Sequence, residues 1–185
     1  EATQVGNMPR LLPLIAVNNA NYMEIDPATR RSLELSRTLN GERRGSLLHA
    51  VDRTLTAAGG RLLGERLAAP LFDADAIDSR LDLVSWFIEG AGCCEKVRAQ
   101  LRVHPDSERA LSRLSLGHGG PRDLAAIANG LKGANRIAGQ ITDAINNGVG
   151  ALAVPQSLPA CLKMMLLPVP LVEKVAPALG DELPL

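Results

Sequence analysis

The chain has 185 residues, of which 46% are hydrophobic and 22% are charged, a balance typical of one globular domain or one domain plus a tail. Its 20 basic and 20 acidic residues cancel, which argues against a free-standing nucleic-acid binder because such proteins usually carry a basic excess. Aromatic residues make up only 2% of the chain, so an aliphatic core of stacked helices is expected rather than a β-sandwich.

In the first third of the chain, helix starts are marked by capping residues. Asp26 followed by Pro27 predicts a short helix, since Asp is a preferred N-cap and Pro suits the first helical position. Ser46 is expected to cap a short turn of helix. Thr56 is expected to cap a longer helix that Pro70 ends.

The middle of the chain predicts three more helices. Spacings of four, three and four residues place four apolar side chains on one helix face: Ile77, Leu81, Val84 and Ile88. A helix over residues 93–103 should stop before Pro105, because the residue preceding a proline avoids the α region. Asp106 or Ser107 should cap the next helix, with Leu111, Leu114 and Ala110 facing inward.

The last part of the chain predicts one long helix beginning at Pro121. Its apolar residues recur at helical spacing, and we expect Leu124, Ile127, Leu131 and Ile141 to form one buried stripe against the helices of residues 76–116. Residues 158–167 could form a further apolar helix. Because no long Val, Ile or Thr alternation occurs, the predicted fold class is mainly α, an irregular helical bundle with little or no sheet.

The search for catalytic chemistry finds no strong motif. Residues 41–46 hold glycines and a serine, but Arg44-Gly45 stands where a phosphate loop needs Gly-Lys. The Gly-rich residues 117–120 predict a helix break rather than an oxyanion loop, because no nucleophile elbow follows them. The aspartates around residues 73–82 are best interpreted as favouring a helix N-terminus. We therefore expect no catalytic, cofactor-binding or metal-binding residues.

Cysteine usage and hydropathy bear on the environment of the chain. Cys93, Cys94 and Cys161 do not form a disulfide framework, and structural roles in a reducing compartment, the cytoplasm, are the expected ones. No apolar run reaches 18 residues, so no membrane partner is expected. The three histidines lie too far apart in the sequence to indicate a metal site.

Several ordered signatures carry a resemblance to a known family. They lie at residues 23–35, 45–48, 52–63, 67–71, 77–80, 106–113 and 121–124. Together they resemble the core domain of the bacterial MutS family of DNA mismatch repair proteins, clearly over residues 3–130. The resemblance divides the chain into residues 1–21, the exit from a preceding connector-like domain, and residues 22–185, a helical core domain that ends before a clamp insertion.

The resemblance implies a non-catalytic structural and coupling domain of a mismatch-recognition ATPase. It would relay ATP-driven changes to the part that holds DNA. ATP and Mg would bind elsewhere in the full-length protein, with no cofactor in this piece. The implied partners of the full-length protein are mismatched double-stranded DNA, a second copy of itself and a MutL-type repair protein. A generic helical docking module and an enzyme with an unrecognised site remain open as alternatives.

Two positions depart from the family pattern or imitate it. Arg66 precedes Leu67 where the family usually has a tryptophan, so that packing position is filled differently. Phe87-Ile88-Glu89 has the letters of the family's mismatch reader, but it lies within an amphipathic helix pattern, and we interpret the match as a coincidence.

The family signature supplies the candidate structural residues. Arg61 is expected to pair with Asp52 or Glu65, and Arg61 and Arg122 should both tie helix ends together. A ladder along one helix face is also expected. The full set is Asp26, Thr29, Asp52, Thr54, Gly60, Arg61, Pro70, Arg80, Asp106, Arg109, Arg113, Pro121, Arg122 and Asp123, with the ladder formed by Asp106, Arg109 and Arg113.

Overall fold

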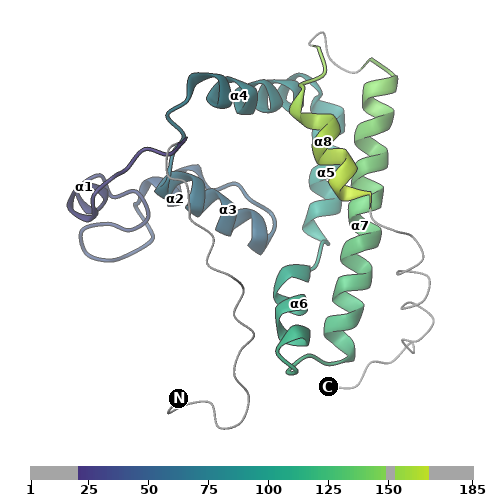
Figure 1. The fold of residues 1–185 in the computed structure, drawn as a ribbon, viewed down its shortest axis with the longest axis horizontal. Coiled ribbons are helices and arrows are strands. Elements are labelled where there is room, and N and C mark those ends of the chain that lie inside the picture. The colour runs from purple at the N-terminus through teal and green to yellow at the C-terminus, as the bar shows by residue number, and fades with distance from the viewer. Residues whose placement is uncertain (1–20, 149–152, 167–185) are drawn as a thin grey trace.

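A computed structural model describes residues 21–148 and 153–166 (Figure 1). These residues form eight helices: α1 (Pro27–Ser32), α2 (Leu47–Val51), α3 (Ala57–Ala68), α4 (Ala74–Glu89), α5 (Ala91–Arg102), α6 (Ser107–Ser115), α7 (Pro121–Asn146) and α8 (Ser157–Met165). The only strand-like pairing within the described part is an isolated antiparallel bridge between Tyr22 and Leu71. The predicted mainly α fold is confirmed.

The predicted domain boundary is not tested by the described residues. Residues 1–20 of the expected exit segment lie outside the described residues, as does the end of the expected core domain after residue 166. The division at residue 21 therefore stays a prediction.

Helix starts follow the capping residues that the sequence indicated. The side chains of Asp26, Ser46, Thr56 and Asp106 each accept a hydrogen bond from a backbone N–H in the first turn of the helix that follows. Ser46 is fully buried, and its hydroxyl also donates to the carbonyl oxygen of Arg43 at 2.7 Å. Each cap satisfies an amide that would otherwise lack a partner.

The longest helix organises the second half of the molecule. Figure 1 shows α7 as a rod with α6 beside its first half and α5 beside its second half, and α8 also packs on α7. At a rise of about 1.5 Å per residue, α7 is roughly 39 Å long. The core between these helices and α4 consists of Trp86, Cys93, Val97, Ile137, Ala138, Ile141, Ala144, Leu158 and Leu162.

Two glycines of α7 allow the preceding segment to approach closely. A Cβ atom placed on Gly130 would overlap the hydroxyl of Ser107, and one placed on Gly133 would lie 2.8 Å from Nδ1 of His104. Ser107 in turn donates to the carbonyl oxygen of Ala126 at 3.3 Å. The junction of α5 and α6 thus packs directly on the α7 backbone.

The expected stripe along α7 is only partly buried. Ile141 is buried together with Ile137, but Leu124, Ile127 and Leu131 are half-buried. The reason is that α6, which covers this first half, is short and contributes mainly the small Ala110 to the core. Leu114 is half-buried. Leu111, expected to face inward, is exposed.

On α4 most of the predicted apolar face is turned toward solvent, although Ile77 is half-buried. Leu81 and Val84 are each 54% exposed and Ile88 is 70% exposed. The helix instead packs through Trp86, which is 1% exposed, together with Phe87 and its neighbour Leu83. The spacing correctly placed the four aliphatic residues on one face. It could not show that a single tryptophan, with its larger apolar area, would decide which face meets α5 and α8.

The helices of the first third form a separate group. Figure 1 shows α1, α2 and α3 on the opposite side of the molecule from α7, with α4 leading from one group to the other. None of the residues within α1, α2 or α3 is fully buried. Among the described residues, no helix combines the length and apolar character that a membrane crossing requires.

Candidate coupling site

An arginine of α3 joins the two groups of helices. Arg61 donates from Nη1 to Oδ2 of Asp106 and from Nη2 to Oδ1 of the same carboxylate, both at 2.9 Å. Its Nη2 also donates to Oε2 of Glu108 at 2.6 Å. Asp106 is the N-cap of α6, so this two-pronged contact fixes the orientation of α3 against the start of α6.

The pair is half-buried, with side-chain exposures of 30% for Arg61 and 24% for Asp106. Hydrogen bonding from the Arg61 guanidinium lowers the pKa of Asp106 to about 2. Hydrogen bonds to Asp106 and then to Glu108 raise the pKa of Arg61. Both groups therefore stay charged at neutral pH, as a lasting ion pair requires.

A second ion pair connects α6 to α7. Arg113 donates from Nε to Oδ1 of Asp123 at 2.8 Å, and Oδ2 of Asp123 accepts from the backbone N–H of Gly120 at 3.1 Å. The hydrogen bond from Arg113 is the main cause of the lowered pKa of Asp123. Because Asp123 lies in the first turn of α7, its negative charge also interacts favourably with the positive end of the helix dipole.

A weaker contact joins the two groups at another place. Both terminal nitrogens of Arg98, on α5, lie 3.5 Å from the carbonyl oxygen of Arg53, in the segment before α3. We call these three contacts, Arg61–Asp106, Arg113–Asp123 and Arg98–Arg53, the coupling site. They connect α3 to α6, α6 to α7, and the segment before α3 to α5.

Several signature residues lie where the sequence placed them but have different partners. The predicted pairing of Arg61 with Asp52 or Glu65 is wrong. Asp52 instead accepts from Arg43 at 2.5 Å and from the hydroxyl of Thr54 at 2.7 Å. The short segment that contains α2 brings Arg43 close to Asp52, whereas Arg61 binds Asp106 at the start of α6.

The predicted ladder along α6 forms only at one end. Arg109 lies 3.6 Å from Asp106, while Arg113 turns to Asp123 on the next helix. Arg122 is exposed and has no hydrogen bond or ion pair within the described part of the chain, so the expectation that it ties helix ends is wrong. At the first turn of α7 the adjacent Asp123 makes that contact instead.

The remaining signature residues support turns and helix starts. Thr29 donates to Asp26 at 2.5 Å beside the α1 cap, and the carbonyl oxygen of Pro70 accepts from Met23 at 2.8 Å. A Cβ on Gly60 would lie 3.3 Å from the Thr54 hydroxyl. Pro121 is the first residue of α7. Arg80 is half-buried on α4.

Two side chains that make contacts at or beside the coupling site, Glu108 and Arg98, were not singled out from the sequence. Glu108 gave a signal, because it is acidic and lies in the first turn of α6 beside a predicted N-cap. Arg98 gave none, since its contact is with a backbone carbonyl 45 residues earlier in the chain.

The cysteines and the possible metal ligands are the remaining candidates for chemistry. Cys93 is buried in the core, and burial raises the pKa of its thiol. Within residues 21–148 and 153–166, no three His, Cys, Asp or Glu side chains gather in a group that could hold a metal ion. Phe87 packs edge-on against Trp86, with ring centroids 5.0 Å apart, as a core residue does.

Comparison with known proteins identifies the domain. The family model described as MutS domain III matches residues 28–174. The DNA mismatch repair protein MutS of Rhodopseudomonas palustris (strain BisA53) is 49% identical over 186 residues, covering 100% of this chain and 20% of that protein. The MutS of Caulobacter sp. (strain K31) is 52% identical over 141 residues, covering 76% of this chain and 16% of that protein. The chain spans about a fifth of the length of most of the curated relatives it matches.

Proposed function

The chain belongs to the MutS family as its domain III, and on that premise we propose that it acts as a structural and coupling domain in DNA mismatch repair. In this role it transmits displacement between the ATPase and the DNA-holding part of the full-length protein. The proposal concerns mechanical connection, and it assigns no catalytic residue to this chain.

The observation that carries the proposal is the coupling site. Helices of the first group have no fully buried residue of their own, yet Arg61 fixes α3 to the N-cap of α6 through two parallel hydrogen bonds. Arg113 then fixes α6 to the first turn of α7. Displacement of α3 is therefore passed to α6 and on to α7, because packed helices move as rigid bodies.

The other elements of the proposal belong to the full-length protein. ATP with Mg would drive the change. Mismatched double-stranded DNA, a second copy of the chain and a MutL-type repair protein would be its partners. The 185 residues here would contribute the connection between those parts.

The test uses the full-length protein with Arg61→Gln, which removes the charge without changing a core residue. ATP-triggered release from a mismatched duplex with blocked ends should slow by about fivefold or more, a typical size for coupling between sites. The affinities for ATP and for the mismatch should change less than twofold. Surface plasmon resonance measures the release, and calorimetry measures nucleotide affinity.

The matched control is Arg66→Gln on the same helix, where the arginine is exposed and makes no ion pair with described residues. It should leave release unchanged. Asp106→Asn, which keeps a capable N-cap, should reproduce the effect of Arg61→Gln, and the double variant should be no slower than either single variant. Unchanged release in Arg61→Gln would refute the coupling role even if the protein lost stability.

A further inference from the structure

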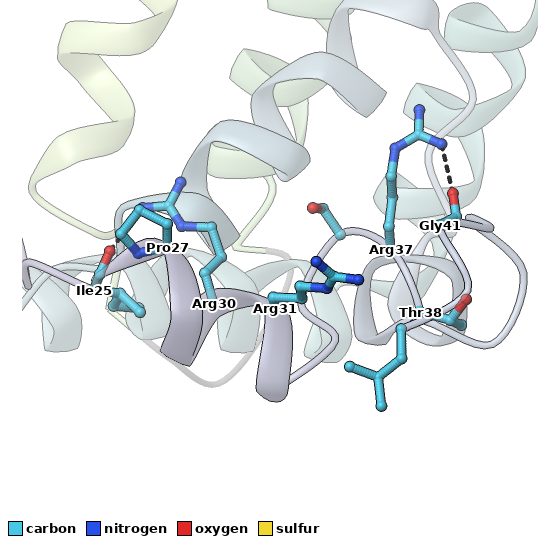
Figure 2. Close-up of a pocket in the computed structure, with 9 residues that line it drawn as sticks. Ile25, Pro27, Arg30, Arg31, Arg37, Thr38 and Gly41 are labelled. Carbon is cyan, nitrogen blue, oxygen red and sulfur yellow. Dashed lines mark hydrogen bonds between the residues drawn. The ribbon is translucent and has the colours of Figure 1, made fainter.

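A pocket of about 450 Å³ lies between α1 and the loop that follows it (Figure 2). Three arginines line it: Arg30 and Arg31 from α1, and Arg37 from the loop. Figure 2 shows Arg31 between the other two, with Arg37 hydrogen-bonded to Gly41. This arginine pocket shares no residue with the coupling site, and the inference does not depend on the proposed function.

The positive charge in the arginine pocket is not balanced from within. Arg30 and Arg37 donate only to carbonyl oxygens, those of Ile25 at 3.3 Å and Gly41 at 2.8 Å. Arg31 makes no hydrogen bond or ion pair with residues that the structure describes, and none of the lining residues carries a carboxylate. Nε of Arg30 is buried and lacks a partner in the described part.

Of the four acidic residues in residues 21–46, two already accept hydrogen bonds from the backbone. Asp26 accepts from the amides of Ala28 and Thr29 at the start of α1. Glu34 accepts from the amide of Leu39 at 2.6 Å. Neither can turn into the pocket without giving up a hydrogen bond that shapes the pocket wall.

The pocket is also preformed. Glu34 has a positive φ of 48°, an uncommon conformation that persists where surrounding contacts fix it. Its carbonyl oxygen accepts from Leu47 at 3.0 Å, and the amide of Thr38 donates to the carbonyl oxygen of Glu42 at 2.8 Å. The loop that carries Arg37 therefore holds its shape before any ligand arrives.

The other walls indicate what kind of anion fits. Ile25, Pro27 and Leu39 give the pocket an apolar side, and Leu39 is 58% exposed. Residues 21–46 carry five arginines but also four acidic residues, so the surface around the pocket would repel as well as attract a polyanion such as DNA. A single carboxylate next to an aliphatic side chain meets both features, because guanidinium groups bind carboxylates with paired hydrogen bonds.

We infer that the arginine pocket is a docking site for an acidic, aliphatic segment of a protein partner. The partner's carboxylate binds between Arg31 and Arg37, and its neighbouring aliphatic side chain packs against Ile25 and Leu39. The Ser36 and Thr38 hydroxyls, which also line the pocket, are available as further donors to the carboxylate.

The test is a fluorescence anisotropy titration of the full 185-residue chain with a labelled Leu-Glu-Leu-Asp-Leu peptide, capped at both ends. When the concentration of the chain is raised to about 2 mM, the anisotropy of the peptide should follow a saturable binding curve. Arg31→Gln and Arg37→Gln should each weaken binding by about tenfold. Arg44→Gln, an exposed arginine in the same loop outside the pocket, is the matched control and should leave binding within about twofold.

Two further probes separate the carboxylate from other anions. A Leu-Gln-Leu-Asn-Leu peptide should not bind. The Arg31→Glu variant should prefer Leu-Lys-Leu-Lys-Leu to the acidic peptide. A labelled, fully paired DNA duplex should show no dependence on Arg31. Absence of saturable peptide binding overturns the inference. So does equal weakening by Arg44→Gln, or a loss of duplex binding in Arg31→Gln as large as the loss of peptide binding.

Discussion

Asp106 has two tasks that depend on a single ionisation. Its carboxylate caps α6 by accepting from the amide of Arg109, and it also receives both hydrogen bonds from Arg61. Protonation would weaken the helix start and the contact between the two groups of helices together. The residue therefore connects local helix stability to the arrangement of the whole molecule.

This dual task predicts a specific acid sensitivity. The pKa of Asp106 is about 2 in the folded chain and about 3.9 in an unfolded one, so the stability it contributes is present above about pH 4 and is lost as the pH falls through about 2. Urea unfolding between pH 6 and pH 2 measures this loss. In Arg61→Gln the pKa of Asp106 should rise, and the fall in stability between pH 4 and pH 2 should become smaller.

The comparison between variants is needed because Asp26, Asp52 and Asp123 also have lowered pKa values. They contribute to acid sensitivity in every variant, and Arg66→Gln should follow the parent chain. An Arg61→Gln curve parallel to that of the parent chain across this range would show that the pair adds no pH-dependent stability.

The same residues show how far sequence can predict a contact. Asp106 was expected as an N-cap because capping is decided within four residues of chain. The partner of Arg61 was expected nearby, at Asp52 or Glu65, but it lies 45 residues away. Nothing local distinguishes one carboxylate from another, since the choice depends on where the fold places α6.

At the scale of elements, α7 depends on a short segment of deeply buried residues. Ile137 and Ile141 belong to the core with Trp86 and Leu158, whereas Leu124 and Ile127 near the start of the helix are half-buried. The second half of α7 thus supplies most of its large buried side chains, which share one core with residues of α4, α5 and α8.

Truncation at Ile141 should therefore be severe. Ile141→Ala removes buried apolar volume and leaves a cavity, and we expect the free energy of unfolding to fall by about 2–5 kcal/mol. Ile88→Ala is the matched control, because the same substitution falls on a side chain that is 70% exposed. It should cost less than about 0.5 kcal/mol. Urea unfolding of the 185-residue chain gives both values, and equal losses would contradict the assignment of the core.

Element positions were largely predictable, but their buried faces were not. Asp26-Pro27, Ser46, Thr56 and Pro121 mark helix starts by local chemistry, and the structure has helices at each. The exposed side of α4 was not predictable, because apolar spacing identifies a face without identifying a neighbour. Trp86 determines which face of α4 is buried only once α5 and α8 are in place.

At the scale of the whole molecule, two groups of helices are joined by α4 and by the coupling site (Figure 1). The first group has little core of its own, and the second is built on α7. The connections between the two groups are a few defined contacts, so substitutions can change them one at a time.

The chain on its own should neither bind nucleotide nor distinguish mismatched DNA. The sequence holds no Gly-Lys-Ser or Gly-Lys-Thr element, and its formal net charge is zero. Calorimetric titration with ATP should show no saturable binding. Any shift of a labelled duplex in a gel should be equal for paired and mismatched DNA and should disappear by about 0.2 M salt. Micromolar ATP binding, or a several-fold preference for the mismatch, would be inconsistent with a purely connecting domain.

The glycines of α7 also determine when this helix can form during synthesis. Gly130, Gly133 and Gly139 each lower helix propensity by about 1 kcal/mol relative to alanine, so α7 has little tendency to form alone. Its partners α5 and α6 precede it in the chain and leave the ribosome first. Because two of these glycines lie where Ser107 and His104 pack, we expect the nascent segment to become helical as it docks onto them. We therefore expect α7 to form together with α5 and α6. Contacts between segments that are close in sequence favour rapid folding.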